Sequence, residues 1–326
     1  MPIFVSGATG FIGSRLVNRL VEEGNTVHAL YRSDKKADQI RMEGIRLFRG
    51  DILDAVSLSE AMNGCESAYH TAAFAGAWAR DPGTVYRLNV DGALNVYRVA
   101  SEQGIRRLVV TSTAGILGPA SLEALNEGSP PPHSYFTHYE ESKYRMEKAL
   151  TTPGPAMPEV VIVNPTRVFG PGILSEANSV TRMIRLYIEG KWRLIPGNGE
   201  RLGNYVFVED VVTGHLLAME KGRPGQRYIL GGDHISYNQL FGIIRKLTGL
   251  EYRLFHIPLW LMLASADGIR IYSRMTGRPP LITRALVRKY NHDWIVSSDK
   301  AVRELGYRPL AAEDGIRRTI EWIRES

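Results

Sequence analysis

The stretch Met1–Gly13 reads MPIFVSGATGFIG, and it decides the fold. A short β-prone run, Ile3–Val5, leads straight into three glycines spaced three residues apart. The next segment, Ser14–Gly24, carries apolar residues in the i, i+1, i+4, i+5 pattern of a helix that lies on a sheet. A strand, a glycine turn and a helix in this order predict the entry of a dinucleotide-binding domain.

The three glycines are Gly7, Gly10 and Gly13, and they stand where a pyrophosphate would lie. A side chain there would keep the backbone away from the anion, whereas the helix that follows offers free N–H groups and a positive dipole end. The alternative is an ordinary glycine-rich turn between a strand and a helix. We expect the turn to bind the cofactor through Gly7, Thr9, Gly10, Phe11, Ile12 and Gly13.

The composition is typical of a soluble globular protein, because 44% of the 326 residues are hydrophobic and 23% are charged. The net charge of +6 suits an anionic cofactor, a membrane surface or no specific partner, and the sequence has no basic stripe with interleaved aromatic residues that would predict nucleic-acid binding. Since Cys65 is the one cysteine, we expect neither disulfides nor a cysteine metal site, and a reducing cytoplasm fits. His133 and His138 lack a third ligand at metal spacing, so no metal is expected.

Targeting and membrane signals are weak in this sequence. The start lacks the charged region and cleavage site of a signal peptide. The most apolar stretch, Ile257–Ala266, is too short to span a bilayer and runs into Asp267 and Arg270. We expect a buried or groove-lining helix there, with contact to a membrane surface as the alternative.

Strand-like runs alternate with helical segments, which predicts an α/β fold with a doubly wound, Rossmann-like parallel sheet. The expected strands after the first are Thr26–Tyr31, Ile45–Phe48, Ser67–His70, Arg107–Thr111 and Val160–Asn164. Ligands bind beyond the carboxyl ends of such strands. Because the alternation then breaks, we expect a dinucleotide-binding domain at 1–165 with roughly 204–230, and a smaller substrate lobe at 166–203 and 231–326.

The end of the second strand bears on the choice between NADP and NAD. Many NAD-binding units place an acidic side chain there for the ribose hydroxyls, but this strand ends in Tyr31 and Arg32. A guanidinium at Arg32, with Lys35 close by, suits a 2′-phosphate, so we predict NADP. Asp34 keeps NAD open, and a solvated loop is the alternative role for the two cations.

Tyr139 and Lys143 stand four residues apart within a predicted helix, Ser134–Leu150. This spacing puts both side chains on one helix face. A tyrosine is a poor acid or base at its reference pKa of about 10, and a nearby ammonium is expected to lower that pKa. This spacing is common in helices, but together with the glycine turn and a strand that runs into Ser112 and Thr113 it indicates a catalytic pair. The alternative is that Tyr139 packs in the core and Lys143 is solvated.

At these positions the chain resembles the extended branch of the short-chain dehydrogenase/reductase superfamily. The resemblance covers most of the chain. It is carried by the glycine turn, Asp51-Ile52, Thr71-Ala72-Ala73, the segment Asn89–Asn95, Tyr139 with Lys143, and Asn164-Pro165 through Gly170.

The resemblance implies a role for each matching residue. Tyr139 would donate and accept the proton, Lys143 would bind the nicotinamide ribose and tune Tyr139, and the hydroxyl of Thr113, with Ser112 as neighbour, would polarise the substrate carbonyl. The remaining expected cofactor contacts are Asp51 and Ile52 at the adenine, Ala72, Ala73, Phe74 and Thr111 along the channel, and Pro165 and Val168 near the nicotinamide. It also implies a homodimer that pairs the helices Tyr86–Glu102 and Ser134–Leu150.

Two groups within the extended branch resemble this sequence. Sugar-nucleotide epimerases and dehydratases usually carry an arginine that binds the diphosphate at the position of Gly203. Here Arg201 lies two residues upstream, and its compensating for that arginine is the open alternative. The other group resembles dihydroflavonol 4-reductase and 3β-hydroxysteroid dehydrogenase. An apolar tail, in which each residue either faces the site or packs in the core, contains Tyr252, Phe255, Trp260, Met262, Tyr272 and Met275.

We therefore favour reduction of a ketone, or oxidation of the alcohol, of a bulky apolar or aromatic molecule. A nucleotide-sugar epimerase or dehydratase with tightly bound NAD(P) is the first alternative. A non-catalytic NADP-binding sensor is the second, although relatives of that kind lack the tyrosine–lysine pair.

Overall fold

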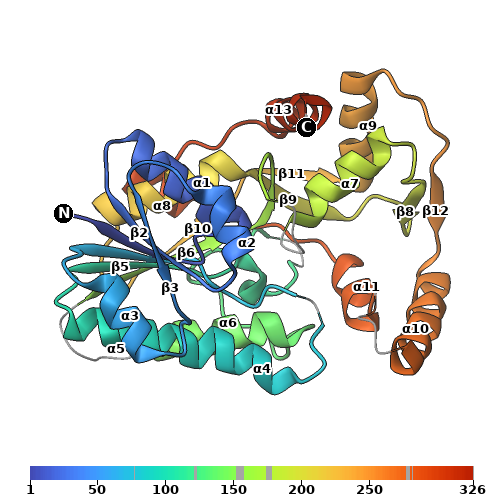
Figure 1. Ribbon diagram of the computed structural model, residues 1–326. Coiled ribbons are helices and arrows are strands. Elements are labelled where there is room, and N and C mark those ends of the chain that lie inside the picture. The colour runs from blue at the N-terminus through green and yellow to red at the C-terminus, as the bar shows by residue number, and fades with distance from the viewer. Residues whose placement is uncertain are drawn as a thin grey trace.

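A seven-stranded parallel sheet forms the centre of the molecule (Figure 1). The computed structural model describes all residues except 77, 121–122, 152–157, 174–177, 277–279, 281 and 326, and the side chain of residue 274. The strands run in the order β10-β6-β5-β4-β1-β2-β3. Their bounds are β1 Ile3–Ser6, β2 Val27–Tyr31, β3 Ile45–Arg49, β4 Ser67–His70, β5 Arg107–Thr111, β6 Glu159–Pro165 and β10 Arg227–Leu230. The predicted doubly wound α/β fold is confirmed.

Helices cover both faces of this sheet (Figure 1). Alternate residues of a strand point to opposite faces, so Phe4 and Val5 of β1 belong to two different hydrophobic clusters. Val5 packs in the cluster of α1 (Phe11–Glu22) and α8 (Val208–Lys221). Phe4 packs in the cluster of the helices on the other face, which are α3 Ala55–Met62, α5 Gly92–Glu102 and α6 His138–Thr151.

Short elements complete this part of the chain. Beyond β2 lie α2 (Asp34–Ala37) and a 3₁₀ turn, Asp38–Ile40. The helix α4 (Pro82–Tyr86) continues through a π-helical turn, Arg87–Asp91, directly into α5, so the predicted helix Tyr86–Glu102 starts earlier than expected. Pro82 occupies the first turn of α4 and the Asp81 side chain caps it, which explains the earlier start.

The second part of the chain builds a smaller lobe around β11-β9-β7. Its strands are β7 Arg167–Phe169, β8 Leu194–Pro196, β9 Leu202–Phe207, β11 Asp233–Ser236 and β12 Phe255–Ile257, and its core helices are α7 Ser179–Ile188, α9 Tyr237–Thr248 and α13 Ala312–Glu325. Aromatic and branched side chains, among them Tyr187, Phe241 and Ile316, fill the space between them. The helix α12 (Asp299–Leu305) packs instead on α8 and β10. The domain division given above stays a prediction.

The helix α10 (Leu259–Thr276) corrects one expectation. It packs on α11 (Arg284–Tyr290) at the outer end of the lobe, away from the central sheet (Figure 1). Trp260 is 70% exposed and Met275 is 82% exposed, and Tyr272 and Phe255 are also exposed. Of the two expected positions, burial is therefore wrong, because α7, α9 and α13 already fill the lobe core, while a groove-lining role stays a prediction. No helix among the described residues is both long and apolar enough to cross a bilayer.

Candidate active site

The glycine turn packs tightly against the end of β4. Gly7 has a φ of +75°, and a Cβ atom built on it would lie 2.4 Å from the backbone nitrogen of Ala72. A Cβ on Gly13 would lie 2.1 Å from the carbonyl oxygen of Gly7. Gly10 caps α1 without a side chain, so the N–H groups of the first helical turn receive no side-chain cap. These features fit a pyrophosphate at the helix start, as the sequence predicts.

A second loop borders the rim where the adenine is expected. The Asp51 side chain accepts a hydrogen bond from the Leu53 backbone at 3.0 Å. From α5, the Asn95 side-chain amide donates to the Ile52 carbonyl at 2.8 Å. A Cβ on Gly92 would lie 2.6 Å from the Ile52 side chain, so α5 approaches this loop closely. The helix thus holds Asp51 and Ile52 in place.

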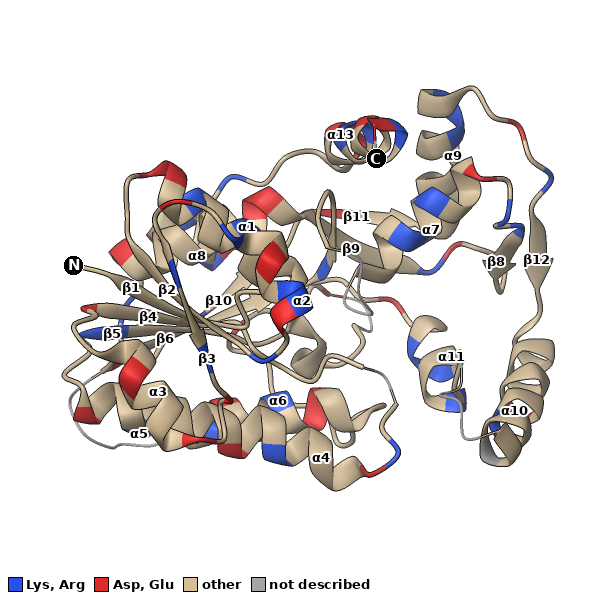
Figure 2. Ribbon diagram, viewed as in Figure 1, with Lys and Arg blue, Asp and Glu red and all other residues tan. Residues whose placement is uncertain are grey.

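Opposite charges meet at the end of β2, and Figure 2 shows that the short helix α2, which follows β2, carries both acidic and basic residues. Arg32 lies 3.5 Å from Asp51, and both side chains remain partly exposed to solvent. Asp34 lies 3.8 Å from Arg49 of β3. The structure therefore brings Arg32 to the expected adenine loop and pairs Asp34 with a different cation.

Asn89 fixes the segment after β4, where a channel wall is expected. Its side-chain oxygen accepts from the Phe74 N–H at 2.7 Å, and its amide donates to the Phe74 carbonyl at 3.1 Å. The same amide donates to the Ser142 hydroxyl at 2.9 Å, one residue before Lys143. Asn89 is fully buried and thereby couples the Ala72–Phe74 segment to α6.

The predicted catalytic residues come together at the end of β5. Lys143 is 1% exposed, and its ammonium donates to the Thr111 carbonyl at 2.7 Å. Thr113 begins the 3₁₀ turn Ala114–Leu117, and its hydroxyl accepts from the Gly115 N–H at 3.1 Å. That hydroxyl also interacts with the Tyr139 phenol. Of the two neighbouring hydroxyls, Thr113 therefore faces Tyr139.

The helix α6 begins at His138, four residues later than predicted, because Thr137 and Glu140 form a capping box. Thr137 N donates to the Glu140 carboxylate at 3.1 Å, and Glu140 N donates to the Thr137 hydroxyl at 3.5 Å. Glu140 is buried and also pairs with Lys289 of α11 at 2.5 Å. Tyr139 therefore sits in the first helical turn, beside a contact with the second lobe.

The pKa values of the pair differ from the sequence expectation. Burial and the Glu140 carboxylate raise the pKa of Tyr139 to about 12, although Thr113 acts to lower it. Burial lowers the pKa of Lys143 to about 8, with Glu147 acting in the opposite direction. The expected lowering of the Tyr139 pKa by the ammonium is not found in the protein alone, because Lys143 is directed at the Thr111 carbonyl.

The end of β6 borders the part of the rim where the nicotinamide is expected. The Asn164 amide donates to the Thr113 carbonyl at 3.1 Å and to the Glu147 carboxylate at 2.6 Å. Pro165 is the last residue of β6, and Val168 is buried in the cluster that also holds Phe11. The strand ends, the turn and α6 thus share one rim, while the cofactor role of each residue stays a prediction.

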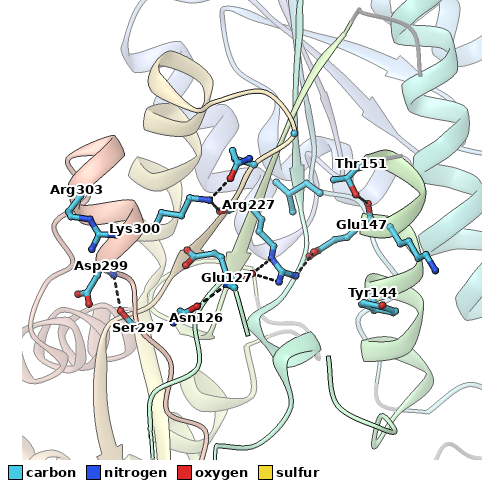
Figure 3. Close-up of a pocket in the computed structure, with 15 residues that line it drawn as sticks. Asn126, Glu127, Tyr144, Glu147, Thr151, Arg227, Ser297, Asp299, Lys300 and Arg303 are labelled. Atoms are coloured by element: carbon cyan, nitrogen blue, oxygen red, sulfur yellow. Dashed lines mark hydrogen bonds and ion pairs between the residues drawn. The ribbon is translucent and has the colours of Figure 1, made fainter. Parts of the chain in front are cut away.

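A separate pocket of about 740 Å³ lies at the β10 edge of the sheet (Figure 3). Its walls carry both signs of charge, with Lys300 and Arg303 of α12 on one side. Arg227 stands between Glu127 and Glu147, and pairs with Glu147 at 3.4 Å. Because the pocket surrounds the start of β10 and not the carboxyl ends of the strands, it is distinct from the predicted cofactor site.

Three groups that shape the site are absent from the sequence prediction. Asn89 lies in a segment quoted for the resemblance, and the signal for it was the spacing of three residues from Asn89 to Gly92 and again from Gly92 to Asn95. Glu140 was readable as the fourth residue of a capping box. Arg167 has no local signal, because its neighbours come from three distant segments.

Comparisons with known proteins agree with this geometry. The family model described as "NAD dependent epimerase/dehydratase family" matches residues 3–231. A Synechocystis sp. protein provisionally named dihydroflavonol 4-reductase is 31% identical, over 98% of this chain and 94% of its own length. The 2-alkyl-3-oxoalkanoate reductase of Stenotrophomonas maltophilia is 28% identical, over 98% of each chain. The sterol-4-alpha-carboxylate 3-dehydrogenase of Mus musculus is also 28% identical, over 97% of this chain and 89% of its own.

The fold is shared with solved sugar-nucleotide enzymes. The UDP-glucose 4-epimerase of Thermotoga maritima superposes with a TM-score of 0.84, covering 100% of this chain and 99% of its own. Its sequence identity to this chain is 24%, so the match bears on the fold alone.

Proposed function

Because this chain belongs to the NAD-dependent epimerase/dehydratase family, we propose that it reduces a ketone of a bulky apolar molecule, or oxidises the corresponding alcohol, with NADP. It is an NAD(P)-dependent oxidoreductase of the extended short-chain dehydrogenase/reductase type. The observation that carries the proposal is the cluster in which Thr113 faces Tyr139 while Lys143 binds the Thr111 carbonyl.

The residues of this cluster have complementary tasks in the proposed reaction. The bound cofactor supplies the hydride that adds to the carbonyl carbon. Tyr139 donates a proton to the developing alkoxide, and its raised pKa keeps it protonated at neutral pH. Because the Gly115 N–H occupies a lone pair of Thr113, the Thr113 hydroxyl acts as a donor, and its proton can turn from the Tyr139 phenol to the same substrate oxygen.

The names of two relatives support a lipid-like substrate that carries an acid. The names of the oxoalkanoate reductase and the sterol carboxylate dehydrogenase both place the reacting oxygen on the carbon β to a carboxylate. We include such a 3-oxo or 3-hydroxy acid among the candidate substrates. A screen of ketones, alcohols and nucleotide sugars, in which NADPH and NADH are followed spectroscopically, tests which of these substrate classes the enzyme accepts.

Cofactor stoichiometry decides between the proposal and its alternatives. A reductase consumes one NADPH per ketone, whereas an epimerase converts a nucleotide sugar with no net redox change. Gly203 and the ion pair of Arg201 with Asp293 at 3.0 Å support the reductase. Epimerisation of UDP-glucose without NADPH consumption would reverse this choice, and cofactor binding without any turnover would indicate a sensor.

We expect Arg32→Ala to raise the Michaelis constant for NADPH by roughly tenfold to a hundredfold and to leave that for NADH nearly unchanged. Arg32 and Lys35 supply exposed cations at the end of β2, and Asp34 is paired with Arg49. Steady-state kinetics with both cofactors measures the effect. Arg41→Ala removes another exposed arginine as the matched control, and a wild type that prefers NADH would contradict the inference.

We also propose a homodimer in which α5 and α6 pack against the same helices of a second copy. Val90 and Leu94 are only partly buried on this side of the sheet, which supports an apolar contact. Light scattering at micromolar concentration is expected to give twice the chain mass of 36.4 kDa, and Leu94→Glu to give the single mass. A monomeric wild type would contradict the proposed dimer.

A cytoplasmic location of the protein also stays a prediction.

A further inference from the structure

Arg167, the first residue of β7, has an aromatic environment. Its guanidinium carbon lies 5.4 Å from the ring centroid of Tyr205, 6.0 Å from that of Tyr237 and 5.2 Å from that of Tyr290. Its Nη1 donates to the Tyr205 hydroxyl at 3.1 Å. A guanidinium has five N–H donors, so most of them have no acceptor among the residues that the structure describes. We call Arg167 and the three tyrosines the arginine box.

The charge of the arginine box has no counter-charge in the described part of the chain. Two other largely enclosed arginines of this protein pair with acids, Arg107 with Glu159 at 2.6 Å and Arg227 with Glu147 at 3.4 Å. Aromatic faces attract a cation, but they carry no net charge. Enclosing a charge is costly unless an anion compensates it. Among the residues that the structure describes, no anion therefore compensates the charge of the arginine box.

A glycine on the neighbouring strand makes room for the guanidinium. Tyr205 pairs with Arg167 in the register of β9 with β7. A Cβ atom on Gly203, two residues before, would lie 2.4 Å from Arg167 Nη1. Any other residue at position 203 would displace the guanidinium, so the glycine and the arginine act as one unit.

The position of β7 directs the arginine box toward the substrate side. Side chains alternate along a strand, and Val168 packs in the cluster of the dinucleotide-binding part while Phe169 packs in the lobe core. Arg167 lies on the same face as Phe169, two residues after Pro165. Tyr290 of the arginine box follows Lys289, which pairs with the Glu140 carboxylate beside Tyr139. The arginine box therefore adjoins the catalytic end of α6.

We propose that Arg167, enclosed by Tyr205, Tyr237 and Tyr290, binds a carboxylate of the substrate. This proposal rests on the proposed function, because it assigns a substrate feature to the same site. Arg167 is the one cation of the arginine box, and two nearby described cations are neutralised, Lys289 by Glu140 and Arg201 by Asp293. One planar guanidinium matches one carboxylate in a bidentate contact, whereas a diphosphate calls for further cations.

The first test compares an acid with its neutral ester. Oxidation of 3-hydroxydodecanoate and of its methyl ester is followed with NADP⁺. Wild type is expected to prefer the acid in kcat/KM by roughly tenfold to a hundredfold, and Arg167→Met to lose this preference. Arg167→Lys, which keeps the charge without the bidentate fork, should retain part of it. Arg193→Met removes another arginine that stacks on a tyrosine, at 4.0 Å from Tyr252, and should retain all of it.

The second test does not depend on turnover. Dodecanoate and methyl dodecanoate are titrated by calorimetry into wild type and into Arg167→Met, each holding NADP⁺, with Arg167→Gln in place of the methionine variant if that variant does not fold. Tighter binding of dodecanoate by wild type alone supports the proposal, even if no alcohol is oxidised and the proposed function fails. Equal binding, no binding of either compound, or a preference that survives in the variant would overturn it. So would UDP-glucose binding that is lost with Arg167.

Discussion

Tyr139→Phe is expected to lower turnover by roughly a hundredfold to ten thousandfold while the protein still binds NADP(H). The substitution removes only the hydroxyl that faces Thr113, and the phenyl ring keeps the packing at the start of α6. Single-turnover kinetics measures the loss, and fluorescence titration with NADPH measures binding. Lys143→Met is expected to weaken NADPH binding as well, because the resemblance gives Lys143 a ribose contact.

The matched control for this substitution is Tyr144→Phe on the same helix. Tyr144 lines the separate pocket at the β10 edge, so its hydroxyl has no part in the proposed proton transfer. We expect near wild-type turnover from it. If Tyr139→Phe retained wild-type turnover too, the proton donor would have to be sought elsewhere in the rim.

The sequence predicted the parts of the molecule whose signals are local. A few adjacent residues predict the strand before Gly7, the glycine turn and α1, because the turn needs backbone conformations that glycine adopts readily. Gly7 has a positive φ, as such a turn requires. The spacing of Tyr139 and Lys143 also needs only one helix. Because parallel strands end at a shared edge, these separate motifs were expected on one rim, where the structure places them.

Long-range packing was the part that sequence reasoning missed. The hydrophobic run of α10 favours burial, but burial also needs space in the lobe core, and Trp260 lies outside that core. The pKa of Tyr139 depends on burial and then on Glu140, whose partner Lys289 is far away in the chain. Arg167 meets rings from β9, α9 and α11, and no periodicity encodes that meeting.

The second large effect is expected from Thr113→Val, which should lower turnover by about tenfold to a thousandfold. Valine keeps the shape of threonine but removes the hydroxyl, which is placed to bind the substrate oxygen as negative charge develops there. The same change leaves the Gly115 N–H without its acceptor, so the melting temperature is measured beside the kinetics.

Two further variants separate chemistry from structure at this position. Thr113→Ser restores the hydroxyl and is expected to recover most of the turnover. Ser112→Ala removes the neighbouring hydroxyl, which is buried, and should change the rate little. If Ser112→Ala is the damaging substitution and Thr113→Val is not, the carbonyl would be polarised by Ser112. The contact between Thr113 and Tyr139 would then serve only to orient the phenol.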